Sequence, residues 1–220
     1  MKGIAYTVIF FLIPFLLPAQ KEQQPFYADI EAFRKADSIK FPAPNQILFI
    51  GSSSFTMWKD VNAYFPGKRI LNRGFGGSTL MDVLHYGREV ILPYKPRQIV
   101  IYCGENDLAL SDTVTARHVL KRFELLYYFI RKHYPRVPLA YISMKPSPSR
   151  DHLMPKFAEA NRLIRQFLDK KPRTVFINIY HKMLAPDGSP RKELFLNDEL
   201  HMNGKGYAIW QKAIAPHLLK

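Results

Sequence analysis

The chain has 220 residues, of which 47% are hydrophobic and 14% aromatic, enough for the core of one globular domain and too many for a disordered chain. Its 32 lysines and arginines against 18 aspartates and glutamates give a formal net charge of +14. These basic residues are spread along the chain without the aromatic-basic motifs of nucleic-acid-binding modules. We therefore expect no nucleic-acid partner, whereas peripheral contact with anionic surfaces stays open.

Residues 1–19 differ in composition from the rest of the chain. Lys2 is their only charge, residues 4–17 are almost wholly apolar, and Ala19 precedes a polar stretch. This pattern is typical of a secretory signal peptide cleaved near Ala19 or Gln20, which leaves a single domain over residues 20–220. The alternative is an uncleaved anchor, although the apolar run is shorter than the ~20 residues of a membrane span. The only cysteine, Cys103, has no partner for an intramolecular disulfide.

Strand and helix patterns alternate along the remaining chain. Strands are predicted over residues 47–50, 70–72, 98–102, 139–143 and 175–178. Helices are predicted over 27–40, over 78–90 with Ser78 as the cap, from 111 or 112 to 133, over 155–169 and from 203 onward. This alternation favours right-handed crossovers and a three-layer α/β/α fold of the flavodoxin-like kind with a five-stranded parallel sheet.

Four polar segments follow predicted strands or precede the last helix. The first two are Gly-Ser-Ser-Ser at 51–54 and Asn-Arg-Gly-Phe-Gly-Gly-Ser at 72–78; the others are Cys-Gly-Glu-Asn-Asp at 103–107 and Asn-Asp-Glu-Leu-His at 197–201. The carboxyl ends of parallel strands are where open α/β sheets carry their chemistry. A serine there acts as a nucleophile when a base, an orienting carboxylate and oxyanion donors accompany it. The four segments contain each of these groups.

Together and in this order, the segments resemble the four blocks of the SGNH or GDSL-type serine hydrolase superfamily, over about residues 47–207. The chain looks nearest to the branch of platelet-activating-factor acetylhydrolase-like enzymes. In that branch the second block likewise reads Asn-x-Gly-x-Gly-Gly, and the last block is Asp-x-x-His followed by Gly-Tyr.

The resemblance implies a role for each matching residue. Ser53 is the nucleophile, with Ser52 in the place of the aspartate that usually precedes it. The oxyanion donors are the backbone N–H groups of Ser53 and Gly77 and the side chain of Asn106. The base is His201 and its orienting carboxylate is Asp198. Asp107 is expected to support the loop that carries Asn106.

These residues predict an exported serine esterase that works through an acyl-enzyme without a cofactor. Short loops after the strands favour small acyl groups such as acetyl, carried by a carbohydrate or a lipid. The alternatives are a lysophospholipase or thioesterase, and a non-catalytic envelope- or carbohydrate-binding protein on the same fold. The remaining histidines lack metal-ligand spacing, so no metal site is expected. Among them, His152 follows the fourth predicted strand and is the second choice for the base.

The export prediction can be tested on the protein purified from its native host. If the leader is cleaved, the intact mass corresponds to a chain that starts near Gln20 or Lys21. Recovery of the full-length chain in the membrane fraction would show instead that the leader is retained as an anchor.

Overall fold

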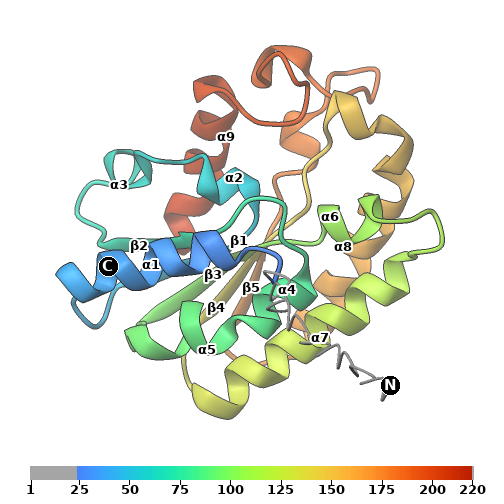
Figure 1. Cartoon of the computed structure of the whole chain (residues 1–220). Helices are drawn as coiled ribbons and strands as arrows, with labels where there is room; N and C mark the ends of the chain where they lie inside the picture. The colour runs from blue at the N-terminus through green and yellow to red at the C-terminus, as the bar shows by residue number, and fades with distance from the viewer. Residues whose placement is uncertain (1–23, 220) are drawn as a thin grey trace, which may run out of the picture.

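The computed structural model describes residues 24–219, so the predicted signal peptide lies outside the described residues. Five parallel strands form one sheet in the order β2-β1-β3-β4-β5, as predicted (Figure 1). Their bounds are β1 Ile47–Gly51, β2 Ile70–Gly74, β3 Gln98–Tyr102, β4 Leu139–Ile142 and β5 Thr174–Ile177. Because β2 and β3 flank β1 on opposite sides, the strand order reverses there, which is where ligands bind in sheets of this kind.

The sheet is covered on both faces, and its central strands β1, β3 and β4 are buried along their whole length. Alternate strand residues such as Ile50 and Ile101 belong to one core cluster, and their neighbours Phe49 and Val100 belong to the other. The first cluster packs against α4 (Leu80–His85), α5 (Gly87–Val90), α7 (Ala116–His133) and α8 (Met154–Leu168), and the second against α2 (Ser53–Thr56), α3 (Val61–Tyr64) and α9 (Gly204–Ile214). These layers confirm the predicted α/β architecture.

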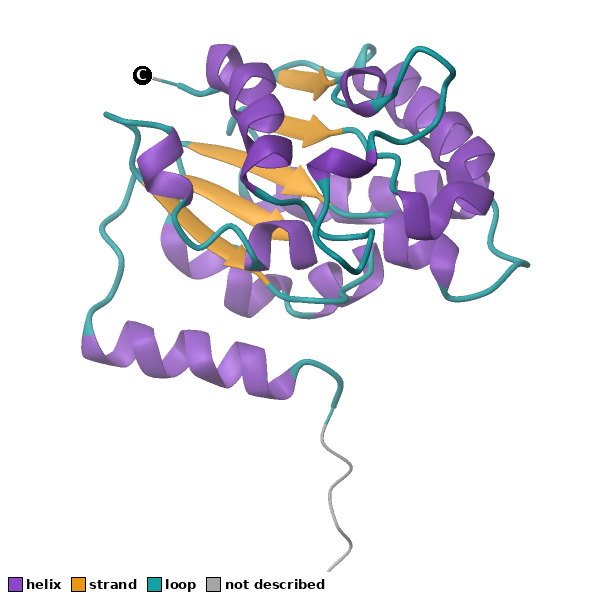
Figure 2. Cartoon of the chain, turned by 90° about the horizontal axis from the view of Figure 1, so that it is seen from above, coloured by secondary structure: helices purple, strands orange, loops and turns teal. Residues whose placement is uncertain are grey.

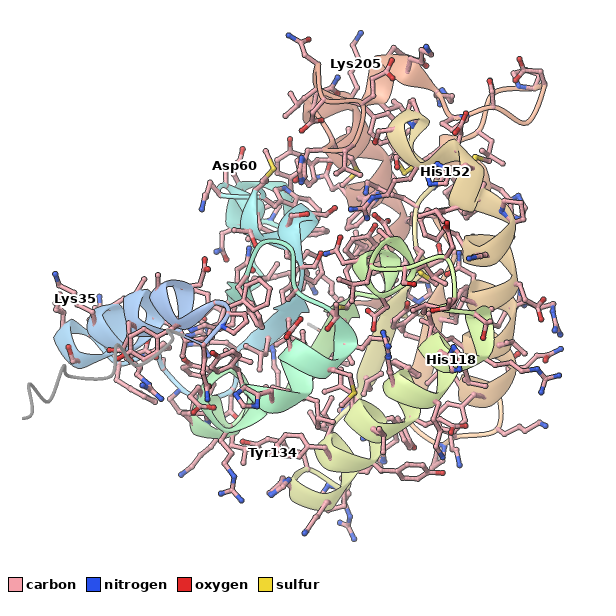
Figure 3. All side chains as sticks on the ribbon, turned by 45° about the vertical axis from the view of Figure 1, so that its right-hand side comes forward. Lys35, Asp60, His118, Tyr134, His152 and Lys205 are labelled. Carbon is pink, nitrogen blue, oxygen red and sulfur yellow. The ribbon has the colours of Figure 1, made fainter. Side chains whose placement is uncertain are left out.

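Helix α1 (Tyr27–Ile39), whose Ile30 is buried in the first core cluster, lies at the edge of the molecule in Figure 2. Asp37 ties it to the sheet, because its carboxylate accepts hydrogen bonds from Arg73 of β2 and from the Tyr94 hydroxyl. Charged side chains are dispersed over distant elements, as Lys35 on α1 and Lys205 on α9 show (Figure 3). Within residues 24–219, no helix has both the length and the apolar character needed to cross a membrane.

The helix predicted over 78–90 is wrong in two respects. It is two helices, since Tyr86 between α4 and α5 leaves the helical conformation with φ −87° and ψ 13°. Its cap is Thr79, whose hydroxyl accepts from the Asp82 N–H while the Asp82 carboxylate accepts from the Thr79 N–H. The Ser78 hydroxyl donates instead to the Gly51 carbonyl, so Ser78 is drawn away from the helix and into the turn after β1.

The helix predicted from 111 or 112 also begins elsewhere. Thr115 caps α7, because its hydroxyl accepts from the His118 N–H and the His118 ring accepts from the Thr115 N–H. Several short elements were not predicted, among them helices α2, α3 and α6 (Glu105–Ala109) and the 3₁₀ segment Pro148–Leu153. The other 3₁₀ segments are Leu92–Tyr94, His181–Met183, Lys192–Leu194 and Ala215–His217.

Candidate active site

The turn after β1 carries the three adjacent serines. Gly51 ends the strand with φ +140°, and a Cβ added there would lie 1.9 Å from the Tyr102 carbonyl oxygen, so only glycine fits. The Ser52 N–H continues the sheet by donating to the same carbonyl at 3.0 Å. Ser53 is the first residue of α2, and its N–H makes no hydrogen bond within residues 24–219. Of these two backbone donors, the Ser53 N–H is therefore the one available to a ligand.

The three serines also differ in accessibility. Ser52 and Ser54 are buried, with 5% and 1% of their surface exposed, whereas Ser53 is half-buried. The Ser53 hydroxyl has no hydrogen-bond partner in the described part of the chain. Ser53 is thus the serine of the three that a substrate can reach.

The loop after β2 is fixed against this turn. The Gly51 carbonyl accepts from the Phe75 N–H at 2.9 Å and from the Ser78 hydroxyl at 3.2 Å. Between these two residues, Gly77 adopts φ +80°, a left-handed conformation that favours glycine. No residue between 24 and 219 accepts a hydrogen bond from the Gly77 N–H. A second unused backbone donor therefore lies in the loop that is bonded to the turn after β1.

Asn106 on α6 joins these two segments. Its Nδ2 donates to the Ser78 carbonyl at 3.0 Å and to the Ser52 hydroxyl at 3.2 Å. Its Oδ1 accepts from Nη2 of Arg150 at 2.9 Å. Both hydrogens of the amide are therefore occupied in this structure, and a ligand oxygen can bind Nδ2 only by replacing one acceptor.

Asp198 and His201 form a hydrogen-bonded pair before α9. The distance from Asp198 Oδ2 to His201 Nδ1 is 2.6 Å, and Asp198 Oδ1 accepts from the N–H groups of Leu200 and His201. Burial acts to raise the pKa of Asp198, but the bonds from His201 and Leu200 outweigh it and lower this pKa to about 2. A carboxylate on Nδ1 orients the imidazole and leaves Nε2 as its second functional nitrogen.

The loop that carries His201 is attached to the turn after β1. The His201 carbonyl accepts from the Leu196 N–H at 2.8 Å. The Tyr207 hydroxyl on α9 donates to the Ser54 carbonyl at 2.9 Å, and this links the helix after His201 to the segment after Ser53. His201 Nε2 and the Ser53 hydroxyl are not hydrogen-bonded to each other here. Such bonds are often long in unliganded enzymes and tighten when substrate binds.

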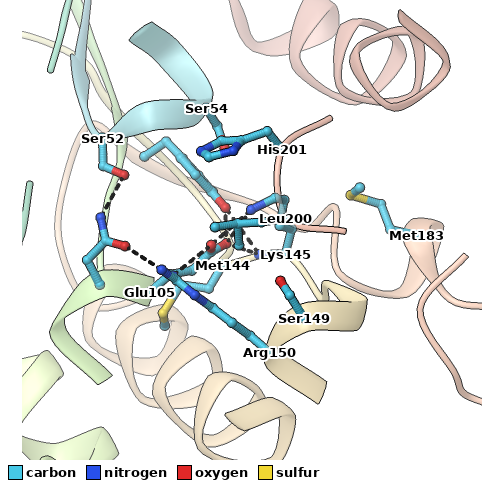
Figure 4. A network of polar contacts seen from close by, with 12 residues as sticks. Ser52, Ser54, Glu105, Met144, Lys145, Ser149, Arg150, Met183, Leu200 and His201 are labelled. Carbon is cyan, nitrogen blue, oxygen red and sulfur yellow. Dashed lines mark hydrogen bonds and ion pairs between the residues drawn. The ribbon is translucent and has the colours of Figure 1, made fainter. Parts of the chain in front are cut away.

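A buried charged network beneath these segments was not predicted. Lys145 Nζ lies 2.9 Å from Glu105 Oε2, and Glu105 also accepts from the Tyr102 hydroxyl (Figure 4). Arg150 Nη1 is 3.7 Å from the same carboxylate oxygen. Figure 4 shows Ser52, Ser54 and His201 around this network. The available sequence signal was Lys-Pro-Ser-Pro-Ser-Arg at 145–150, two cations in the loop after a predicted strand.

Asp107 has the supporting place that was predicted for it. Its side chain is fully buried, and Oδ2 accepts from the Leu80 N–H at 2.9 Å. Oδ1 accepts from Arg122 of α7 at the same distance. Burial raises the pKa of Asp107 above its ordinary value. Asp107 therefore ties the start of α4, just after Gly77, to the helix that carries Asn106.

His152, the second choice for the base, is an exposed residue in the Pro148–Leu153 segment. Its ring Nδ1 lies 3.8 Å from the carboxylate of the neighbouring Asp151. Over residues 24–219, no cluster of three or more His, Cys, Asp or Glu side chains could hold a metal ion.

Several solved structures share the architecture of this chain. A Streptococcus pneumonia protein provisionally named a platelet activating factor superposes with a TM-score of 0.76 at 22% identity, over 90% of this chain and 94% of its own. A GDSL-like lipase from Bacteroides thetaiotaomicron gives 0.72 at 18% identity, over 86% and 97%. A carbohydrate esterase family 3 protein from Talaromyces cellulolyticus gives 0.61 at 14% identity, over 79% and 95%.

No curated protein sequence matches the chain. A model of the GDSL-like lipase/acylhydrolase family, however, matches residues 51–209, from the last residue of β1 into α9. All the segments described above fall within this range or at its edges. The chain is thus a hydrolase of ester bonds, and it belongs to the GDSL-like lipase/acylhydrolase family.

Proposed function

We propose that the chain is an exported serine esterase that removes small acyl groups, acetyl above all, from a carbohydrate or a lipid. The observation that carries the mechanism is the 2.6 Å hydrogen bond between Asp198 and His201 on a loop tied to the turn of Ser53. It leaves Nε2 of an oriented imidazole as the proton acceptor for the Ser53 hydroxyl.

The reaction proceeds in two stages. Ser53 Oγ attacks the acyl carbonyl as His201 Nε2 takes its proton, and Asp198 stabilises the imidazolium that forms. His201 then gives the proton to the departing alcohol, which leaves the acyl group on Ser53. Water, activated by the same imidazole, hydrolyses this acyl-enzyme and restores the serine.

Three donors stabilise the negative oxygen of each tetrahedral intermediate. Two are the unused N–H groups of Ser53 and Gly77. The third is Asn106 Nδ2, which exchanges the neutral Ser52 hydroxyl for the charged oxygen. Hydrogen bonds to a charged acceptor are roughly twice as strong as those to a neutral one, so this exchange favours the intermediate over the free enzyme.

The preference for a small acyl group such as acetyl carries over from the short loops expected after the strands, and the alcohol part rests on one structural neighbour. The similarity to a carbohydrate esterase supports a sugar as the alcohol part.

Acyl-chain length provides a direct test of this class. With p-nitrophenyl esters of two to twelve carbons, kcat/KM should be highest for acetate and should fall as the chain grows. Acetylated xylan should release acetate, and lysophospholipid should be a poor substrate. A maximum at a long chain, or faster turnover of lysophospholipid, would assign the chain to the lysophospholipases instead.

The nucleophile can be identified chemically. A fluorophosphonate should label the mature protein at Ser53, because this serine is the accessible one beside unused donors. Ser53→Ala should abolish labelling and lower kcat by at least ~10³-fold. Ser52→Ala and Ser54→Ala are the matched controls and should still be labelled. Peptide mapping that places the adduct on Ser52 or Ser54 would contradict the assignment.

The dependence of kcat/KM on pH tests the proposed base and its carboxylate. Because the pKa of Asp198 is lowered to about 2, this carboxylate stays ionised above pH ~4, and its protonation causes no loss of activity there. The ascending limb of kcat/KM should therefore report the loss of a single proton, and none from Asp198.

Substitutions separate the base from its orienting carboxylate. His201→Ala removes the proton acceptor and should cost more activity than Asp198→Ala, which leaves a misoriented imidazole. The double variant should be scarcely worse than His201→Ala, because the two residues act as one unit. Losses that multiply, or a His201→Ala enzyme that keeps most of its activity on p-nitrophenyl acetate, would show that the base lies elsewhere.

A further inference from the structure

Arg150 makes its closest polar contact with the proposed oxyanion donor. Nη2 of its guanidinium donates to Asn106 Oδ1 at 2.9 Å, and the Arg150 side chain is only 18% exposed. We propose that Arg150 is a positioning residue of the reaction, which orients and polarises the Asn106 amide so that Nδ2 faces the negative oxygen of the intermediate. This inference rests on the proposed function, in which Asn106 is an oxyanion donor.

The two partners of Asn106 determine which way its amide points. A guanidinium can only donate hydrogen bonds, and the Ser78 carbonyl can only accept them. If the amide were rotated by half a turn, its NH₂ group would face Arg150 and its oxygen would face Ser78. Each of these contacts would be repulsive. Together, Arg150 and Ser78 therefore hold Nδ2 on the side of the turn after β1.

The charge of Arg150 also strengthens the donor. A cation bonded to Oδ1 withdraws electron density from the amide, which makes the Nδ2 hydrogens more positive, and bonds in such a chain reinforce one another. The effect grows when Nδ2 meets a charged oxygen instead of the Ser52 hydroxyl. Arg150 thus stabilises the intermediate more than the bound substrate, and its removal should lower kcat rather than raise KM.

Arg150 is itself held on both sides. Its Nη1 lies 3.7 Å from Glu105 Oε2. Burial alone would raise the pKa of Glu105, but the charges of Lys145 and Arg150 outweigh it and lower this pKa, so the carboxylate is ionised. The preceding residue, Ser149, donates through both its N–H and its hydroxyl to the Glu199 carbonyl, at 3.1 and 3.0 Å. The Pro148–Leu153 segment therefore links the oxyanion donor to the loop of Asp198 and His201.

A double-mutant cycle tests the proposal on the purified mature chain with p-nitrophenyl acetate. Asn106→Ala should lower kcat ~100-fold or more, as loss of an oxyanion donor does. Arg150→Met should lower kcat by at least ~10-fold with KM within ~2-fold of wild type, and Arg150→Lys, which keeps the charge without the planar fork, should restore part of the loss. In the Asn106→Ala background, Arg150→Met should lower kcat by less than a further ~2-fold, because Arg150 acts through the Asn106 amide, which this background lacks.

Arg162 on α8 supplies the matched control. Its exposed guanidinium pairs with Glu159 at 2.7 Å and makes no hydrogen bond to Asn106, Glu105 or Lys145 in the described residues, so Arg162→Met should leave kcat and KM unchanged. If Arg150→Met does not fold, as judged by circular dichroism, the same cycle is run with Arg150→Lys, whose partial loss should likewise disappear in the Asn106→Ala background.

The outcomes distinguish a failure of this inference from a failure of the proposed function on which it rests. Losses from Arg150 and Asn106 that multiply, or a loss at Arg150 that appears in KM, would show that Arg150 contacts the substrate itself and would overturn the positioning role. Full activity of Arg150→Met beside a deficient Asn106→Ala would overturn it while the proposed function stands. Full activity of Asn106→Ala would remove the oxyanion role of Asn106 and with it the positioning role of Arg150, while the proposed esterase activity would stand.

Discussion

The close approach of the β1 and β3 backbones at Gly51 is the constraint on which the rest of the site depends. A side chain there would collide with the Tyr102 carbonyl, so the strand can end in a turn that still pairs with β3 through the Ser52 N–H. The Gly51 carbonyl in turn accepts from Phe75 and Ser78, which fixes the loop of Gly77. Three segments far apart in the sequence thus meet because one residue has no side chain.

The sheet and the four polar segments could be predicted because they depend on local pattern. Buried parallel strands are short apolar runs, and their carboxyl ends share an edge, so residues such as Ser53 and Asn106 could be expected near each other before any distance was known. Helix boundaries were less predictable where tertiary contacts decided them. Ser78 is a good cap by its type, but the Gly51 carbonyl accepts its hydroxyl and Thr79 caps the helix instead. The site roles of Ser53, Gly77, Asn106, Asp198 and His201 stay predictions until the variants are measured.

The network of Glu105, Lys145 and Arg150 could not be predicted because its members meet only in three dimensions. Glu105 lies about forty positions before Lys145, and nothing in the local sequence of either indicates a buried partner. Buried ion pairs contribute little net stability, since desolvation offsets the attraction between the charges. In this network two cations, Lys145 and Arg150, face one carboxylate, Glu105, which leaves a local excess of one positive charge beneath the proposed oxyanion donors. This sign is the one that favours a developing negative oxygen.

Ser52, which replaces the aspartate of the motif that the sequence resembles, borders the same network through Asn106. The Ser52 hydroxyl is 3.2 Å from Asn106 Nδ2, so a carboxylate in its place would bind the amide more tightly and would face the negative oxygen of the intermediate. In this chain the neutral hydroxyl is an acceptor that the intermediate can displace at little cost. In the positioning role proposed for Arg150, which donates to the other end of the same amide, the Asn106 donor gains most when its partner changes from neutral to charged. The departure from the family pattern at Ser52 is therefore compatible with catalysis at Ser53.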